Sequence, residues 1–255
     1  MTIPRQVHLC WLSGDPFPPL IDRCIASWRR HLPDYLIVHW DAAALASGNW
    51  PRWVHEATAA RKYAFAADYI RLYALHSQGG IYLDADVQVL KPLDDLLESM
   101  SFMGRERGGD LEPAVMGAVQ GLPWLREAMA YYEKRPFLKP DGTYDQRPLP
   151  IVLGEVLAGR YGLDLSRVAA NGDEVMVPDA QLRILPAEVL SPKCRVTGSV
   201  HATTRTCTIH HFDGQWVDQS LVARLKLAVH RLLIGVLGRE RHAQLVRWIR
   251  TVRSS

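Results

Sequence analysis

The chain lacks several features that place a protein in a special class. Four of its 255 residues are cysteine, and no two of them form a C-x-x-C pair or a zinc-ligand spacing. We therefore expect Cys10, Cys24, Cys194 and Cys207 to be reduced, as in a cytoplasmic protein. No segment approaches the roughly 20 consecutive apolar residues that span a bilayer, and the first residues lack the pattern of a secretory signal. The sequence predicts a protein that is soluble or at most peripheral to a membrane.

The net charge is also small, but the charged residues are unevenly distributed. The 30 Lys and Arg residues against 27 Asp and Glu give a formal net charge of +3, which is too small to indicate a nucleic-acid-binding protein. Residues 221–253 hold eight Lys and Arg and one acid, so the rest of the chain is mildly acidic. Apolar residues recur between these cations at helical spacing, which predicts a main domain over 1–220 and a basic amphipathic helical tail over 221–255. Such a tail either packs on the body with a solvated basic face or docks on an anionic membrane surface.

The chain contains the alternation of strand and helix patterns that is typical of an α/β fold. An apolar run at 7–12 precedes a helical pattern at 20–32 and a second strand at 36–40. Residues 61–78 predict a helix that ends at a Gly-Gly pair, and an apolar strand follows at 81–83. This order predicts a Rossmann-like, mostly parallel central sheet flanked by helices. Further predicted elements are a strand at 87–90, a short helix at 93–100, a polar loop at 105–113, a strand at 114–119, a helix at 123–133 and a strand at 206–211.

Two carboxylates follow the apolar strand at 81–83. Asp84 and Asp86 stand at the carboxyl end of a predicted parallel strand, the edge at which open α/β sheets bind their ligands. In an extended chain residues two apart point the same way, so both carboxylates can face one ion. Two oxygen donors that leave other positions open suit Mg²⁺ or Mn²⁺ shared with substrate phosphates. A D-x-D triplet is also common as a solvated turn, and the buried strand that leads into it is what favours a site.

Two further groups of residues support a site at this edge. Asp68 and Arg71 lie three residues apart on a mostly apolar helix, which is more typical of a site or a buried network than of an exposed ion pair. In IHHFDGQW, residues 209–216, two histidines end a predicted strand and Trp216 offers an indole N–H. An imidazole beside the D-x-D pair favours Mn²⁺, with Mg²⁺ as the second candidate, because Mn²⁺ accepts nitrogen more readily.

Taken together, these residues resemble a known family, the bacterial D-x-D glycosyltransferases of glycosyltransferase family 32. The resemblance is carried by IPRQVHLCWLSGDPFPPLIDRCIASWRRHLPDY, by RKYAFAADYIRLYALHSQGGIYLDADVQVLKPLDDLL and by IHHFDGQW. That family includes capsule and lipopolysaccharide sugar transferases and yeast-type initiating mannosyltransferases, and it is distantly similar to the glucosylating clostridial toxins. The resemblance implies a GT-A fold, Mn²⁺ dependence and transfer from a nucleotide-diphosphate sugar with retention of configuration. A UDP-hexose is the first expectation for the donor and GDP-mannose the second, and the implied acceptor is a lipid-linked or surface-polysaccharide precursor.

The resemblance also implies roles in donor binding. It implies that Trp11 stacks on the nucleotide base and that Asp68 and Arg71 hold the ribose or donor sugar and the phosphate. Tyr82 corresponds to a tyrosine that contacts the donor. Trp216 corresponds to an indole that contacts the diphosphate.

For the metal, the resemblance points to the D-x-D pair and one C-terminal histidine. It implies that Asp84 and Asp86 hold the ion, with Asp86 as the direct ligand, and that one of His210 and His211 completes the site, His211 being slightly favoured. We accordingly expect Asp86, Asp84 and Arg71 to carry catalysis.

The sequence departs from the family pattern at several positions. Gln215 stands where serine is common, Leu149 stands where a polar residue is frequent, and residues 141–148 resemble the segment that closes over the sugar. Residues 104–113 align poorly, so the acids Glu106 and Asp110 are candidates without an assigned role.

Two other readings remain open. A sugar-nucleotide-binding module without turnover is favoured by Leu149 alone. A haloacid-dehalogenase-like phosphatase also places D-x-D after an apolar strand, but Gln88 occupies the position that usually carries Thr or Val, and a full βαβ unit precedes the motif here.

Overall fold

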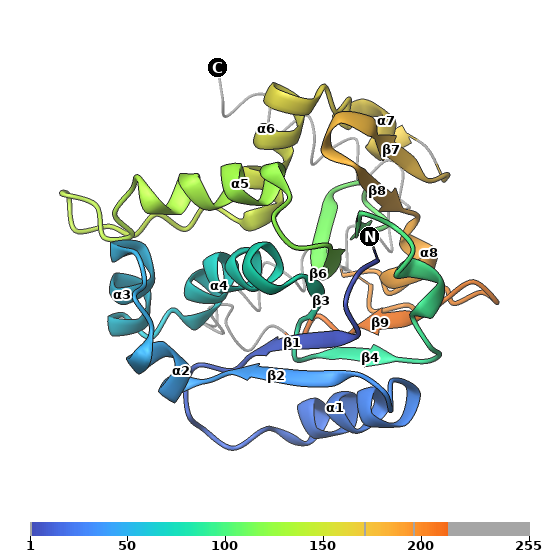
Figure 1. Ribbon diagram of the computed structural model, residues 1–255, viewed down its shortest axis with the longest axis horizontal. Helices are drawn as coiled ribbons and strands as arrows, with labels where there is room; N and C mark the ends of the chain where they lie inside the picture. The colour runs from blue at the N-terminus through green and yellow to red at the C-terminus, as the bar shows by residue number, and fades with distance from the viewer. Residues whose placement is uncertain (1, 171, 196, 214–255) are drawn as a thin grey trace. The chain divides into compact units, whose positions relative to one another are not determined.

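A computed structural model describes residues 2–170, 172–195 and 197–213 of the chain (Figure 1). Met1–Lys193 and Val200–Asp213 form one compact unit, which holds the sheets and the candidate site. The predicted domain boundary at 220 and the tail at 221–255 lie outside the described residues. Within the described part of the chain, no helix combines the length and the apolar character that crossing a membrane requires.

Strands and helices alternate along most of this unit. The strands are β1 (Gln6–Cys10), β2 (Leu36–Trp40), β3 (Gly80–Leu83), β4 (Val87–Val89), β5 (Ser101–Arg105), β6 (Leu111–Ala118), β7 (Val175–Val177), β8 (Leu182–Leu185) and β9 (Thr208–His210). The α-helices are α1 (Pro19–His31), α2 (Ala42–Ser47), α3 (Arg52–Ala59), α4 (Tyr63–Gln78), α5 (Pro123–Glu133), α6 (Leu149–Tyr161), α7 (Leu165–Ala170) and α8 (Ala187–Leu190). Two short 3₁₀ helices are η1 (Asp94–Leu96) and η2 (Pro178–Ala180).

The main sheet of the described residues has seven strands in the order β2-β1-β3-β6-β5-β8-β7. Strands β2, β1, β3, β5 and β8 run in one direction, and β6 and β7 run against them. Helix α4 packs on β1 and β3 and is flanked by α3 and α5, whereas α1 packs against β4 (Figure 1). The predicted α/β architecture with a mostly parallel central sheet flanked by helices is confirmed.

Helix α4 and strand β3 hold most of the candidate residues. Most buried positions of α4 are alanine, leucine or isoleucine, and the remaining two are Tyr69 and Arg71. The helix ends at Gly79, whose φ of 68° lies in the left-handed region that favours glycine. Gly80 follows with φ 101° and starts β3, in which all four residues are buried. This sharp connection brings one face of α4 alongside the end of β3.

Strand β6 is irregular near the candidate site. Its pairing with β5 steps from Met103↔Met116 directly to Gly104↔Glu112, so that residues 113–115 of β6 have no partner on β5. Bulges of this kind free backbone groups and redirect side chains. The backbone of this bulge binds residues of the site, as described below.

Several predicted elements differ from the structure. The polar loop predicted at 105–113 contains the end of β5 and the start of β6, and β5 itself was assigned no strand. The helix predicted at 93–100 is only the short 3₁₀ helix η1. Asp84 and Asp86 do not continue β3 as an extended chain, because the N–H of Val87 donates to the carbonyl of Asp84 at 2.9 Å and closes a turn.

Candidate active site

The D-x-D motif forms a turn between β3 and β4. The N–H of Asp84 donates to the carbonyl of Ala114 on β6 at 2.8 Å, which fixes the turn to the edge of the main sheet. Asp86 accepts from the N–H of Asp213 at 2.8 Å, and its carbonyl accepts from the N–H of His211 at 3.0 Å. The turn is thus held from both sides, by β6 and by the segment that follows β9.

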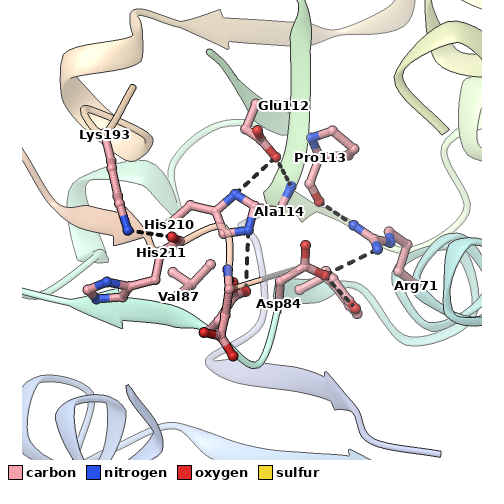
Figure 2. A network of polar contacts seen from close by, with 12 residues as sticks. Arg71, Asp84, Val87, Glu112, Pro113, Ala114, Lys193, His210 and His211 are labelled. Atoms are coloured by element: carbon pink, nitrogen blue, oxygen red, sulfur yellow. Dashed lines mark hydrogen bonds and ion pairs between the residues drawn. The ribbon is translucent and has the colours of Figure 1, made fainter. Parts of the chain in front are cut away.

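Asp84 belongs to a buried network around Arg71 (Figure 2). One guanidinium nitrogen of Arg71 lies 3.1 Å from Asp84 Oδ1 and 3.2 Å from Asp68 Oδ1, and the other donates to the carbonyl of Pro113 at 2.8 Å. The hydroxyl of Tyr82 donates to the same Asp84 oxygen at 3.0 Å. The guanidinium also lies over the Tyr82 ring, 4.5 Å from its centre. All of these contacts of the Asp84 side chain are made through Oδ1.

Burial determines the electrostatics of this network. It raises the pKa of Asp68 to about 7 even though Arg71 favours the anion, and it raises the pKa of Asp84 in the same way. Burial also disfavours the charged form of Arg71, but Asp84 and the other negative groups around it together outweigh burial and raise the pKa of the guanidinium. Arg71 therefore stays a cation and holds two carboxylates that would otherwise be costly to bury.

His210 joins the acidic pair from β9. Its Nε2 lies 3.3 Å from Asp86 Oδ1, and its Nδ1 lies 3.4 Å from Glu112 Oε1 (Figure 2). Burial alone would lower the pKa of His210, but Glu112 and Asp86 raise it well above its usual value. Burial raises the pKa of Asp86. His210 and the N–H of Asp213 lower it by more, so that the pKa of this carboxyl is about 2. Asp86 is therefore the carboxylate of the pair that is most strongly held as an anion.

His211, the histidine that we favoured as the metal ligand, points elsewhere. Its ring contacts the Gln88 side chain at 3.1 Å, and its carbonyl accepts from Lys193. Successive side chains of an extended segment alternate between two sides, so His210 and His211 at the end of β9 cannot both face the D-x-D turn. The geometry favours His210 in place of His211.

The other residues expected to bind a donor are placed as follows. Trp11 follows β1 and is half-buried, its indole N–H donates to the Asp15 carbonyl at 2.7 Å, and its ring meets Phe17 edge-on at 5.3 Å. Tyr82 is buried beneath Arg71 with 1% of its surface exposed. Leu149 is 1% exposed at the start of α6, which makes it a packing residue. Trp216 and Gln215 lie outside the described residues.

Glu112 is a residue of this site that the sequence did not reveal. It lies in the segment 104–113, for which no role was assigned, and the acid of that segment that contacts His210 is neither Glu106 nor Asp110. A usable signal was present, because Glu112 directly precedes Pro113 and an apolar strand, just as the D-x-D pair directly follows one.

The donor set fits a divalent cation. One ligand atom each from Asp84, Asp86 and His210 lies within 4.8 Å of the other two, the single group of this kind found in the described part of the chain. Two carboxylate oxygens and one imidazole nitrogen suit Mn²⁺ or Mg²⁺ and leave positions for phosphate oxygens. Asp68, Arg71 and Tyr82 adjoin this set through Asp84, whereas Trp11 shares no contact with it that would make it a ligand.

Residues 18–103 are similar to a described protein family. Residues 18–103 match the model of a family described as "Glycosyltransferase sugar-binding region containing DXD motif". The matched residues include α4, β3 and the turn that carries Asp84 and Asp86. Residues 18–103 are therefore similar to a glycosyltransferase sugar-binding region. The resemblance to D-x-D glycosyltransferases is confirmed to this extent, while membership of family 32 and a bacterial origin stay predictions.

Individual relatives share shorter segments with the chain. "Inositol phosphoceramide mannosyltransferase 3" of Schizosaccharomyces pombe is 25% identical over 133 residues, which cover 50% of this chain and 36% of that protein. "Glucan organizing enzyme 1" of Cryptococcus neoformans is 46% identical over 50 residues, which cover 20% of this chain and 14% of that protein. The matches therefore span no more than about a third of the length of these relatives. Among solved structures, "PaToxG Glycosyltransferase" has a TM-score of 0.49 at 18% identity and covers 66% of this chain and 72% of its own.

Proposed function

We propose that the protein is a retaining glycosyltransferase of the GT-A type that moves a hexose from a nucleotide-diphosphate sugar to a saccharide acceptor. The observation that carries this proposal is the meeting of Asp84, Asp86 and His210 at the end of β3, inside a glycosyltransferase sugar-binding region. Three metal-ligand side chains in one place suit a transferase that must stabilise a departing diphosphate.

The chemistry follows from the charge that develops during transfer. When bound, Mn²⁺ would neutralise part of the negative charge on the leaving diphosphate. Asp86 and Asp84 would hold that ion, and Arg71 orients the Asp84 carboxylate from behind and favours its ionised form. We expected Arg71 to contact the phosphate directly, and that stays a prediction. In the structure the two terminal guanidinium nitrogens already contact Asp68, Asp84 and the carbonyl of Pro113.

For the stereochemical course we propose attack on the face from which the diphosphate leaves. The bond between the anomeric carbon and the phosphate oxygen breaks, the acceptor oxygen bonds to that carbon, and the acceptor proton passes to the leaving phosphate oxygen. This route needs no carboxylate nucleophile on the opposite face. A glycosyl-enzyme adduct trapped and found by mass spectrometry would contradict it.

We propose the donor and the acceptor as chemical classes. A UDP-hexose is the first candidate for the donor, and GDP-mannose is the second, which the name of the S. pombe mannosyltransferase supports. That name also gives a lipid-borne acceptor, which supports a lipid-linked saccharide, such as a capsule or lipopolysaccharide precursor, at the cytoplasmic face of a membrane. The rival reading of a binding module rests on Leu149 alone, and this residue is buried at the start of α6.

Thermal unfolding tests the proposal directly. A ligand that binds only the folded state raises the melting temperature with its occupancy. We expect one nucleotide base among UDP-glucose, UDP-galactose, UDP-N-acetylglucosamine and GDP-mannose to raise the Tm, and to do so only in the presence of Mn²⁺. Asp86→Asn should abolish this shift and should lower the rate of transfer or donor hydrolysis by more than a hundredfold. The substitution removes the carboxylate of the metal site that is most strongly held as an anion.

The matched control is Asp110→Asn. It removes an exposed carboxylate immediately before β6 and should leave the Tm shift intact. Absence of a shift with every nucleotide would overturn the transferase proposal, and phosphatase substrates would be tested next. A Mn²⁺-dependent shift without donor hydrolysis or transfer would identify a sugar-nucleotide-binding module.

A further inference from the structure

Glu112 contacts the candidate metal ligand His210 from the side that faces away from the D-x-D pair. Its Oε1 lies 3.4 Å from His210 Nδ1, while His210 Nε2 lies 3.3 Å from Asp86. The two ring nitrogens therefore face different carboxylates, Nε2 on the metal side and Nδ1 on the β6 side, where the contact with Glu112 is an ion pair and Nδ1 has no hydrogen-bond partner among the described residues (Figure 2). Both residues are largely buried, with 13% of the Glu112 and 12% of the His210 side-chain surface exposed.

The bulge in β6 fixes the position of Glu112. Its Oε1 also accepts from the N–H of Ala114 at 3.2 Å, a backbone group that the bulge leaves without a partner on β5. The neighbouring carbonyls of the same bulge bind the other half of the site, that of Pro113 accepting from Arg71 and that of Ala114 from the N–H of Asp84. One irregular segment thus places the D-x-D turn and the carboxylate behind His210 together.

A histidine binds a cation through a nitrogen that carries no proton, so its other nitrogen must carry one. A carboxylate that accepts the second N–H fixes both the tautomer and the orientation of the ring, and it raises the basicity of the ligating nitrogen. We infer that Glu112 is a positioning residue that holds the Nδ1–H of His210 and thereby presents Nε2 to the metal shared with Asp84 and Asp86. The inference rests on the proposed function, since it requires that the site binds a divalent ion.

Mn²⁺ affinity of the full-length protein, measured from the electron paramagnetic resonance signal of free Mn²⁺, tests this role without turnover. Glu112→Ala should raise the Kd for Mn²⁺ by roughly 10- to 100-fold, the range typical of lost outer-shell carboxylates. Glu112→Gln should restore most of the affinity, because an amide oxygen still accepts from Nδ1–H and from the Ala114 N–H. Asp110→Asn removes an exposed charge close by and should leave the Kd unchanged.

A second measurement separates positioning from a merely structural role. Histidine ¹⁵N spectra of the Cd²⁺-loaded protein, assigned with His210→Asn, should show His210 protonated at Nδ1 and bound through Nε2. Glu112→Ala should lose this single form, and Glu112→Gln should keep it. Melting temperatures measured without metal give the purely structural effect of each substitution.

The possible failures can be told apart. An unchanged Mn²⁺ Kd in Glu112→Ala overturns the role of Glu112 and leaves the metal site standing. A loss in Glu112→Gln as large as in Glu112→Ala also overturns it, because the carboxylate itself would then be a ligand. Absence of Mn²⁺ binding in the unaltered protein overturns the proposed metal site and this inference with it.

Discussion

His8 is a buried residue whose two ring nitrogens both have partners. Its Nε2 lies 2.8 Å from the carbonyl of Gly79, to which it must donate, and its Nδ1 accepts from the indole N–H of Trp40 at 3.2 Å. The neutral ring thus connects β1, β2 and the end of α4. A second proton on Nδ1 would point at the Trp40 N–H. Burial also makes the charged ring costly and thereby lowers the pKa of His8 below 6.5.

This arrangement predicts a pH dependence of stability. Because the pKa of His8 is lower in the folded state, the unfolded chain binds the proton more readily, and stability is lost as the pH falls below about 6.5. We expect the free energy of unfolding of the wild type to fall more between pH 7.5 and pH 5.5 than that of His8→Gln, whose amide still donates to Gly79. Urea titrations at the two pH values measure the difference. Equal losses in both proteins would show that His8 does not contribute.

Single residues of the site differ in how far the sequence predicts them. Asp84 and Asp86 were predictable because a buried strand leads into two charges. The choice between His210 and His211 was not, since it depends on which side of β9 faces the turn, and that is set by the pairing of Val87 with His210. The sequence offers a local signal for Glu112, which precedes Pro113 and an apolar run, but its contact with His210 depends on the bulge in β6.

The junction between α4 and β3 positions the acidic turn relative to Asp68 and Arg71. Gly80 has φ 101°, and a Cβ placed on it would lie 2.5 Å from Gln6 Cγ and 2.9 Å from the Gln6 carbonyl oxygen on β1. The conformation and the close approach of β1 both require glycine at this position.

Substitution of Gly80 should therefore be costly. Gly80→Ala forces a strained backbone and a contact with β1, and we expect it to lower the free energy of unfolding by about 1–3 kcal/mol. Gly159→Ala is the matched control, because Gly159 lies inside α6 and a Cβ there meets no atom within 4 Å. That control should stabilise the protein by roughly 0.5–1 kcal/mol. Urea unfolding measures both, and a neutral Gly80→Ala would contradict the proposed constraint.

Elements defined by their own periodicity were predictable, and elements defined by distant partners were not. Helix α5 and strand β2 match their predicted bounds because their apolar spacing and flanking prolines are local signals. Strand β5 pairs with β8 at long sequence separation, and nothing in the short segments of β5, β7 and β8 distinguishes them from loops. The D-x-D turn was not predictable for the same reason. Its conformation depends on hydrogen bonds to β6 and to the segment that follows β9.

The charge of the whole molecule is divided between two parts of the sequence. Residues 221–253 hold eight Lys and Arg and one acid, and the remainder of the chain is mildly acidic. This asymmetry predicts that any attraction to an anionic surface originates in that C-terminal segment. A lipid-linked acceptor would make such an attraction useful, because it would bring the enzyme to the membrane that carries its substrate.

Binding of the full-length protein to lipid vesicles tests this prediction. Each basic residue near an anionic surface contributes roughly 1 kcal/mol, so replacing Arg247, Arg250 and Arg253 by glutamine should weaken binding to phosphatidylserine-containing vesicles by about a hundredfold or more. Raising the ionic strength should weaken wild-type binding in the same direction, because exposed charges are screened. Vesicles of neutral phosphatidylcholine serve as the control and should bind both proteins equally poorly. If the triple variant sediments with anionic vesicles as the wild type does, the basic segment is a solvated face of the protein and the acceptor must be sought among soluble saccharides.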